Sequence, residues 1–106
     1  MAQLKRTTIT SDQAPRPIGA YSLGMAVNPG HLIYVAGQVA MNAEGTLVGP
    51  EDAATQTKQV YTNIGQILAA AGATFNNVVE FTTYVVGRDS IQKFIEGRNQ
   101  IYPSLY

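Results

Sequence analysis

The sequence contains no cysteine and only one histidine, His31. The lack of cysteine excludes disulfides, a thiol nucleophile and a thiolate-bound metal from these 106 residues. A single histidine cannot form a multi-histidine metal site, and no serine has a histidine close to it in the sequence for a hydrolase triad. We therefore expect no bound metal.

Motifs for phosphate binding and membrane insertion are also missing. The glycines match neither GxGxxG nor GxxxxGK[ST], so no phosphate-binding loop is expected. The acidic residues show no spacing that is typical of a paired-carboxylate site. The first residues, MAQLKRTT, lack an apolar run, so we expect neither a signal peptide nor a spanning segment, and a cytoplasmic location is the default.

Charged residues are scarce, at 13% of the chain, whereas hydrophobic residues make up 45%. The surface of a small monomer usually carries more charge, so this balance predicts additional burial between subunits. Seven basic residues balance seven acidic ones, and the basic residues are scattered along the chain. We therefore expect neither nucleic acid nor a membrane as a partner.

A chain of 106 residues is too short for two independent cores, so a single domain is expected over residues 1–106. Residues 18–27 and 31–41 have apolar residues at the spacing of strands. The turn Asn28-Pro29-Gly30 between them predicts a β-hairpin. Both faces of the second strand are apolar, so it is expected to be central in a sheet.

Residues 4–10 and 78–86 are rich in β-branched side chains, which predicts a short first strand and a long buried strand. Residues 51–71 have small or apolar residues at helical spacing, and Gly72 follows as a stop signal. Strands that alternate with helices in this order predict an α+β fold with two helices on one face of the sheet.

A second helix is predicted to begin at Asp89, with Gln92 as the partner in a capping box, and to end before Pro103. Arg98 lies near the centre of the apolar stripe of this helix, and Asn99 lies on its flank. An arginine that points inward must reach solvent along its aliphatic stem or meet an anion. A solvent-reaching side chain, an ion pair with a neighbouring subunit and a ligand site all satisfy this requirement.

Gly37 interrupts the apolar run of residues 31–41. Glycine in a central strand costs stability, so its presence there favours a ligand or another backbone that approaches closely. A bulge or a packing notch explains Gly37 equally well. Gly37 is the first candidate for a binding site.

Three stretches resemble the signatures of the RidA/YjgF family, the reactive-intermediate imine deaminases that are also known as liver perchloric-acid-soluble proteins. These stretches are Ala14-Pro15 with Ile18-Gly19-Ala20-Tyr21-Ser22, then Tyr34-Val35-Ala36-Gly37-Gln38, then Gln56-Thr57-Lys58-Gln59-Val60 with Asn63-Ile64. The resemblance continues to Tyr102 and rests on the order and spacing of the pieces.

The resemblance implies a chorismate-mutase-like fold, a YjgF-type mixed sheet with two helices on one face. It also implies a homotrimer around a central barrel, with a ligand cleft at each subunit interface. Active members hydrolyse 2-imino acids to 2-keto acids and ammonia, so the implied partner is a small carboxylate metabolite and no cofactor is expected. The alternative is a non-catalytic trimer that binds a metabolite or another protein.

By position, the cleft tyrosine of the family falls on Tyr21, its glycine on Gly37 and its helix asparagine on Asn99. Ala36 stands where the family usually has a serine, which removes a hydroxyl from the cleft. Arg98 is next to Asn99 and could offer a carboxylate site. The predicted substrate-binding residues are therefore Tyr21, Ala36, Gly37, Arg98 and Asn99.

In the family, an arginine binds the substrate carboxylate and a glutamate positions the attacking water, and both belong to strands after the second helix. Since the printed sequence ends at Tyr106, we expect either a longer natural chain that supplies them or a shortened chain without the catalysis of the family. The longer chain is favoured because the strand at residues 78–86 would otherwise lack its neighbours. We name no catalytic residue, and deaminase activity is expected only if residues beyond Tyr106 supply the arginine. A ribonuclease role, sometimes attached to the family, finds no basic patch here.

Overall fold

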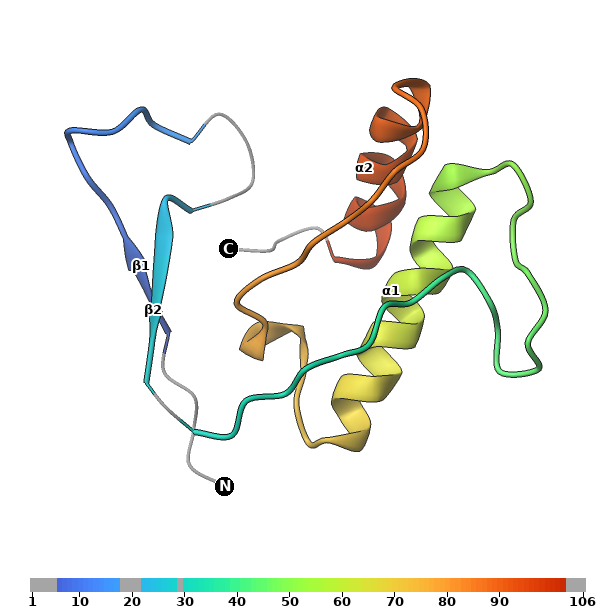
Figure 1. Ribbon diagram of the computed structural model, residues 1–106, viewed down its shortest axis with the longest axis horizontal. Coiled ribbons are helices and arrows are strands. Elements are labelled where there is room, and N and C mark those ends of the chain that lie inside the picture. The colour runs from blue at the N-terminus through green and yellow to red at the C-terminus, as the bar shows by residue number, and fades with distance from the viewer. Residues whose placement is uncertain (1–5, 18–21, 29, 103–106) are drawn as a thin grey trace.

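The computed structural model describes residues 6–17, 22–28 and 30–102 (Figure 1). In chain order, its elements are β1 (Arg6–Ile9), β2 (Gly24–Val27), α1 (Ala53–Ala70), the short 3-10 helix η1 (Phe75–Asn77) and α2 (Asp89–Ile101). The prediction of an α+β fold with two helices is confirmed.

β1 and β2 form a two-stranded antiparallel sheet, with Arg6 opposite Val27. The prediction of a hairpin between residues 18–27 and the following segment is wrong, because β2 pairs with the first strand instead. Residues 31–39 are extended, but they join no ladder in the described part of the chain. An alternating pattern predicts which face of a strand is apolar and leaves its hydrogen-bonding neighbour unspecified. Pro29 of the predicted turn lies outside the described residues.

α1 forms within the predicted range of residues 51–71, and Asp52 is its N-cap. The Asp52 carboxylate accepts hydrogen bonds from the Thr55 hydroxyl at 2.7 Å and from the Thr55 backbone N–H at 3.2 Å. These two bonds, the hydroxyl bond first, hold the pKa of Asp52 below its ordinary value of 3.8. After the helix, Gly72 adopts a φ of +77°, a conformation that glycine reaches without steric cost.

α2 confirms the second predicted helix, but the predicted capping box of Asp89 is wrong. Arg88 is the N-cap residue and makes no side-chain capping bond. Asp89 is itself the first helical residue and lies in the first turn. There its carboxylate interacts favourably with the helix dipole instead of capping the backbone. Near the other end of α2, Gly97 is buried against α1. A Cβ on Gly97 would lie 3.0 Å from Thr57 Cβ and would collide with the Ala54 carbonyl oxygen, so the two helix backbones are in close contact.

An aromatic cluster joins the two helices to the segment around η1. Tyr61 of α1 is 3% exposed, and its ring lies edge-on to Phe75 and Phe81, with centroids 6.1 and 5.4 Å away. Phe94 of α2 approaches Tyr61 at 6.4 Å. Tyr102 lies 4.8 Å from Phe75, and its hydroxyl donates to the Phe75 carbonyl oxygen. Rings from four parts of the chain therefore form one core.

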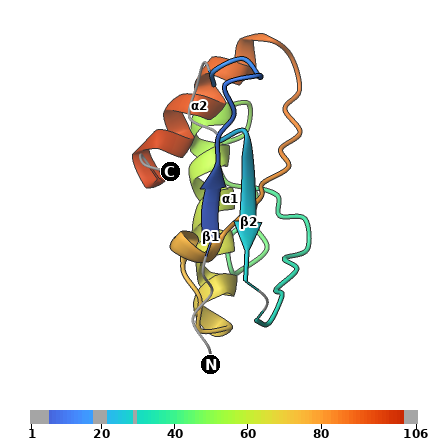
Figure 2. The same ribbon diagram turned by 90° about the vertical axis from the view of Figure 1, so that its left-hand side faces the viewer.

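The helices form one layer, and the extended segments 31–39 and 78–86 run across one face of it (Figures 1 and 2). The small sheet lies beside this layer and is linked to it where the Arg6 guanidinium donates to the Val78 carbonyl oxygen. Within the described ranges, neither helix combines the length and the apolar character needed to cross a membrane.

The prediction of a long buried strand at residues 78–86 is wrong for the described chain. The segment is extended but belongs to no ladder, and Tyr84 and Val86 are each 93% exposed. A strand with two apolar faces needs hydrogen-bonding neighbours at its edges and a packed layer on each face. The helices supply one of these layers.

Candidate functional site

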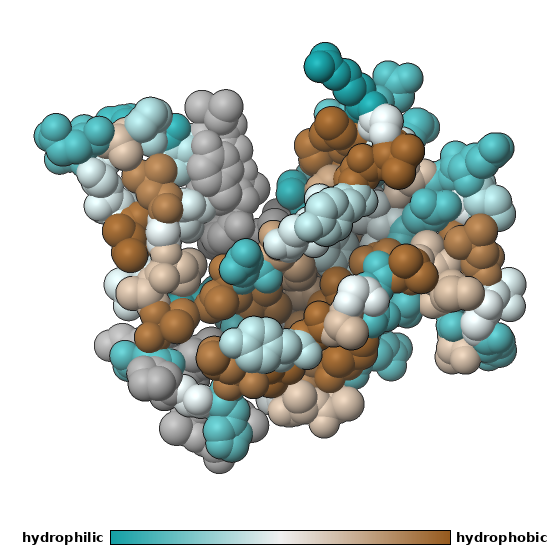
Figure 3. Space-filling model, in the orientation of Figure 1, coloured by the Kyte–Doolittle hydropathy of each residue, from teal (hydrophilic) through white to brown (hydrophobic). Residues whose placement is uncertain are grey.

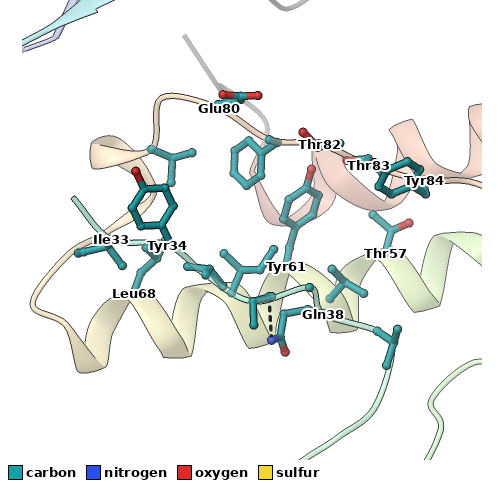
Figure 4. A pocket seen from close by; sticks show the side chains of 18 of the residues that line it. Ile33, Tyr34, Gln38, Thr57, Tyr61, Leu68, Glu80, Thr82, Thr83 and Tyr84 are labelled. Carbon is teal, nitrogen blue, oxygen red and sulfur yellow. Dashed lines mark hydrogen bonds between the residues drawn. The ribbon is translucent and has the colours of Figure 1, made fainter.

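A large open cavity lies between the segments 31–39 and 78–86, with α1 behind it (Figure 4). One segment contributes Ile33, Tyr34 and Gln38, the other contributes Glu80, Thr82, Thr83 and Tyr84, and Tyr61 reaches between them from α1. The cavity measures about 1550 Å³, whereas pockets for small ligands usually measure about 300–1,000 Å³. A small metabolite would therefore occupy only part of this space.

Large apolar side chains are exposed on the same face of the molecule (Figure 3). The most exposed are Leu32, Tyr34, Val39, Tyr84 and Val86, which all belong to the two extended segments. Exposed apolar surface that gathers on one face is typical of a protein–protein interface, a ligand-binding groove or a membrane contact. The segments 31–39 and 78–86 therefore both line the cavity and carry the exposed apolar side chains.

Two neighbouring residues predicted for the site, Ala36 and Gly37, border the cavity. A Cβ on Gly37 would meet no atom of the described residues within 4 Å, so open space adjoins this glycine in the part of the chain that the structure describes. The Gln38 side-chain amide donates to the Ala36 carbonyl oxygen at 3.2 Å, the bond that Figure 4 shows as a dashed line. Tyr21 lies outside the described residues.

Arg98 and Asn99 are not among the residues that border the cavity. The Arg98 guanidinium carbon lies 5.6 Å from the centroid of the Phe94 ring, and its Nε and Nη2 donate to Asn99 Oδ1 at 3.4 and 3.2 Å. Phe94 does border the cavity, so Arg98 lies behind a lining ring. The half-buried arginine is stabilised by an aromatic face and a neighbouring amide.

One histidine and two glutamates border the cavity, namely His31, Glu51 and Glu80. All three are exposed. In the ranges that the structure describes, no group of three or more His, Cys, Asp or Glu residues could hold a metal ion. The cavity therefore offers ionisable groups at its rim and an apolar interior.

Tyr61 borders the cavity but was not among the predicted site residues. Its position carried a signal, because it follows Thr57 by four residues and precedes Leu68 by seven. These three residues are the buried ones of α1. Helical spacing alone would therefore have placed Tyr61 on the inner face of the helix.

The cavity suits a small molecule with one polar end and a short apolar end. Gly37 is exposed and adjoins open space, so a ligand can approach its backbone, where an N–H group is a donor for an anionic group. The hydroxyls of Thr82 and Thr83 lie on the opposite border (Figure 4). Apolar side chains form most of the lining, which is the usual composition of a metabolite site.

Comparison with known proteins gives relatives over most of the chain. A RutC family protein of Pyrococcus abyssi is 35% identical over 103 residues, which are 97% of this chain and 76% of that protein. Proteins named 2-iminobutanoate/2-iminopropanoate deaminase are 40% identical in Rattus norvegicus and 46% identical in Bos taurus, in each case over 77% of this chain. The matched stretch spans 58% of the length of the rat and bovine proteins.

A solved structure gives the same result at the level of the fold. The YyfB protein of Yersinia pestis, described as a protein of unknown function of the conserved Rid family, matches with a TM-score of 0.69 at 30% identity. The match covers 88% of this chain and 74% of that one. Residues 11–106 match the family described as endoribonuclease L-PSP. This chain therefore belongs to the endoribonuclease L-PSP family, which is also called the YjgF/RidA family.

Proposed function

We propose that this protein hydrolyses 2-imino acids to 2-keto acids and ammonia, in a cleft that includes Ala36 and Gly37. Water adds to the imine carbon, the C–N bond of the resulting amino alcohol breaks, and ammonia leaves as the carbonyl forms. The reaction transfers protons and no electrons, so it needs no redox cofactor. Proton transfer and carboxylate binding are the tasks that the protein must perform.

One observation carries this proposal. The relatives named as imine deaminases match 77% of the chain, and Ala36 and Gly37 of the matching region border an open cavity. The backbone of exposed Gly37 adjoins open space, and its N–H would be a suitable donor for a substrate carboxylate or for the oxygen that develops at the imine carbon. We assign no general acid or base, and the rim carboxylates Glu51 and Glu80 are not assigned catalytic roles.

The same proposal places the complete cleft between subunits of a cytoplasmic homotrimer with a central barrel. Arg98 is half-buried and Asn99 is exposed on α2, and neither residue borders the cavity of its own chain. In an assembled trimer, they would face a cleft to which a second subunit contributes, together with Tyr21. Arg98 could then bind the substrate carboxylate, as could an arginine supplied by residues that follow Tyr106.

A non-catalytic metabolite-binding trimer is the second candidate, and two observations favour it. Ala36 has no hydroxyl to offer a substrate. The Arg98 guanidinium is held by Phe94 and Asn99, so the substrate would have to compete for it. Such a protein would bind 2-keto acids without accelerating the hydrolysis of imines.

The experiment that separates these candidates is an imine-hydrolysis assay on the full natural protein. An amino-acid oxidase with catalase generates 2-iminobutanoate from 2-aminobutanoate, and the decay of the imine is followed against a control with heat-unfolded protein. The proposal predicts faster decay with the folded protein, together with release of 2-ketobutyrate and ammonia. Decay at the control rate, with 2-ketobutyrate still bound by the protein, would establish the non-catalytic alternative.

A further inference from the structure

One amide side chain of α1 contacts the end of the segment that carries Gly37, and a second amide side chain of α1 donates to the first. Asn63 Nδ2 donates to the carbonyl oxygens of Met41 at 2.8 Å and Val39 at 3.3 Å. Gln59 Nε2 donates in turn to Asn63 Oδ1 at 2.7 Å. The helix is thus joined to the segment by two hydrogen bonds from Asn63, and a third bond within the helix holds the Asn63 amide.

These bonds meet the segment at a tight turn. The Met41 N–H donates to the Val39 carbonyl oxygen at 2.8 Å, and the Val48 N–H donates to the Ala40 carbonyl oxygen at 2.8 Å. Ala40 is only 5% exposed. Three successive carbonyl groups are therefore paired at the turn, whereas residues 31–38 join no strand ladder in the described chain.

The geometry suits an amide at position 63. The Asn63 NH₂ group has two N–H donors, one for the Met41 carbonyl oxygen and one for the Val39 carbonyl oxygen, which also accepts from the Met41 N–H. The bond from Gln59 to the Asn63 oxygen fixes the orientation of that amide, so its NH₂ group faces the turn. Gln59 and Asn63 are four residues apart, the spacing that brings side chains together on a helix. Both belong to the stretch from Gln56 to Ile64 that resembles a family signature.

We propose that Gln59 and Asn63 are positioning residues, which hold the Val39–Met41 turn against α1 and thereby fix the Ala36–Gly37 backbone for the ligand. Gly37 lies two residues before the Val39–Met41 turn. The hydrogen bonds from this turn to Asn63 are therefore close in sequence to Gly37 and attach its segment to α1. This inference rests on the proposed binding of 2-keto and 2-imino acids beside Gly37. It adds a role for residues that do not themselves touch the ligand.

The test measures the affinity of the full protein for 2-ketobutyrate, and the amide exchange of residues 38–41 without ligand. Asn63→Asp keeps the shape of the side chain but replaces both donors by a carboxylate beside two carbonyl groups. We expect faster amide exchange at the turn and affinity reduced by roughly three- to tenfold, the effect of losing about one hydrogen bond. Gln59→Leu leaves Asn63 in place without its orienting bond, and we expect a smaller loss in the same direction.

Two further variants distinguish positioning from general stability. Asn76→Asp introduces the same charge at an exposed residue of η1, and it should leave affinity and exchange at the turn unchanged. Asn63→Gln retains the NH₂ donors on a longer side chain and should recover part of the affinity. If Asn63→Asp does not fold, Gln59→Leu alone decides the question.

The outcomes separate this inference from the proposed function. Wild-type affinity in folded Asn63→Asp or Gln59→Leu would overturn the positioning role. Loss of affinity in Asn76→Asp equal to that in Asn63→Asp would overturn it as well, since the effect would then be one of charge. A wild-type protein that binds no 2-ketobutyrate would instead contradict the proposed function, while exchange at the turn would still report on the hydrogen bonds.

Discussion

Asp52 shows how one side chain determines where α1 begins. Its carboxylate accepts two hydrogen bonds from Thr55, and these lower its pKa below 3.8. A carboxylate with a lowered pKa in the folded state stabilises the fold above its unfolded-state pKa, and this contribution is lost as the pH falls through the folded-state value. The start of the helix is therefore sensitive to acid.

We predict that Asp52→Ala lowers the melting temperature at pH 7, because the cap and its charge are both lost. Below pH 3.8 the difference from the wild type should narrow, since the wild-type carboxylate is then becoming protonated. Thermal unfolding followed by circular dichroism measures both values. Asp52→Asn is the matched control, because it keeps an acceptor and removes only the charge. A difference that stays constant between neutral and acidic pH would contradict the role of the charge.

Arg98 carries the second prediction at this scale. We predict that Arg98→Met weakens the binding of 2-ketobutyrate by about tenfold or more, since a hydrogen bond to a charged group is worth roughly 1.5–3 kcal/mol. The methionine stem preserves packing on Phe94, so the loss of the cation–π contact should reduce the free energy of unfolding by no more than about 1 kcal/mol. Calorimetric titration and light scattering check both statements. Unchanged affinity in an intact assembly would reject Arg98 as a ligand-binding residue.

At the scale of elements, the contact between α1 and α2 depends on Gly97. We predict that Gly97→Ala lowers the free energy of unfolding by about 1–3 kcal/mol, because the added methyl group would collide with the Ala54 carbonyl oxygen and overpack the helix contact. This cost should exceed the gain of about 1 kcal/mol from better helix propensity. Urea unfolding curves give the value.

Gly65→Ala is the matched control for this helix contact. Its Cβ would lie 3.2 Å from the edge of the Phe75 ring, a side chain that can shift, whereas the Gly97 methyl group would meet backbone. We expect a clearly smaller loss for Gly65→Ala. Equal losses in the two variants would show that the backbone contact at Gly97 has no special importance.

The helices and the positions of β1 and β2 were predictable from the sequence, whereas the pairing of the strands was not. Helical spacing, Gly72 and the position of Pro103 are local signals, and the bonds that form α1 and α2 are local too. A strand depends on a neighbour that is remote in sequence, so the pattern at residues 31–41 predicted an extended segment correctly and its partner wrongly. The capping box at Asp89 failed for a related reason, because a four-residue motif does not specify which residue first becomes helical.

The candidate site was predictable only in part. The break in the apolar run pointed to Gly37, and the structure places Gly37 and Ala36 beside the cavity. Tyr61 could have been found from its helical spacing to Thr57 and Leu68. The contact of Asn63 with the Val39–Met41 turn joins residues more than twenty positions apart, and no pattern in the sequence indicates it.

At the scale of the whole molecule, the apolar faces of the two extended segments lead to a prediction about assembly. Val39, Tyr84 and Val86 are at least 65% exposed in the single chain. We predict a homotrimer in solution, because burial of this face between subunits removes apolar surface from water at about 25 cal/mol per Å². Light scattering on the purified natural protein gives its mass directly. A stable monomer at micromolar concentration would contradict the trimer and the intersubunit cleft.

The central claim is that a small carboxylate metabolite binds beside Gly37, and nuclear magnetic resonance titration with 2-ketobutyrate tests it most directly. The titration uses the uniformly ¹⁵N-labelled natural protein and its Gly37→Val variant. A valine at position 37 meets open space within the chain, so the variant should fold normally and lose the ligand. The account predicts saturable shifts at the backbone amides of residues 36–38 in the wild type and none in the variant. Shifts confined to other parts of the molecule, or equal binding by folded Gly37→Val, would contradict it.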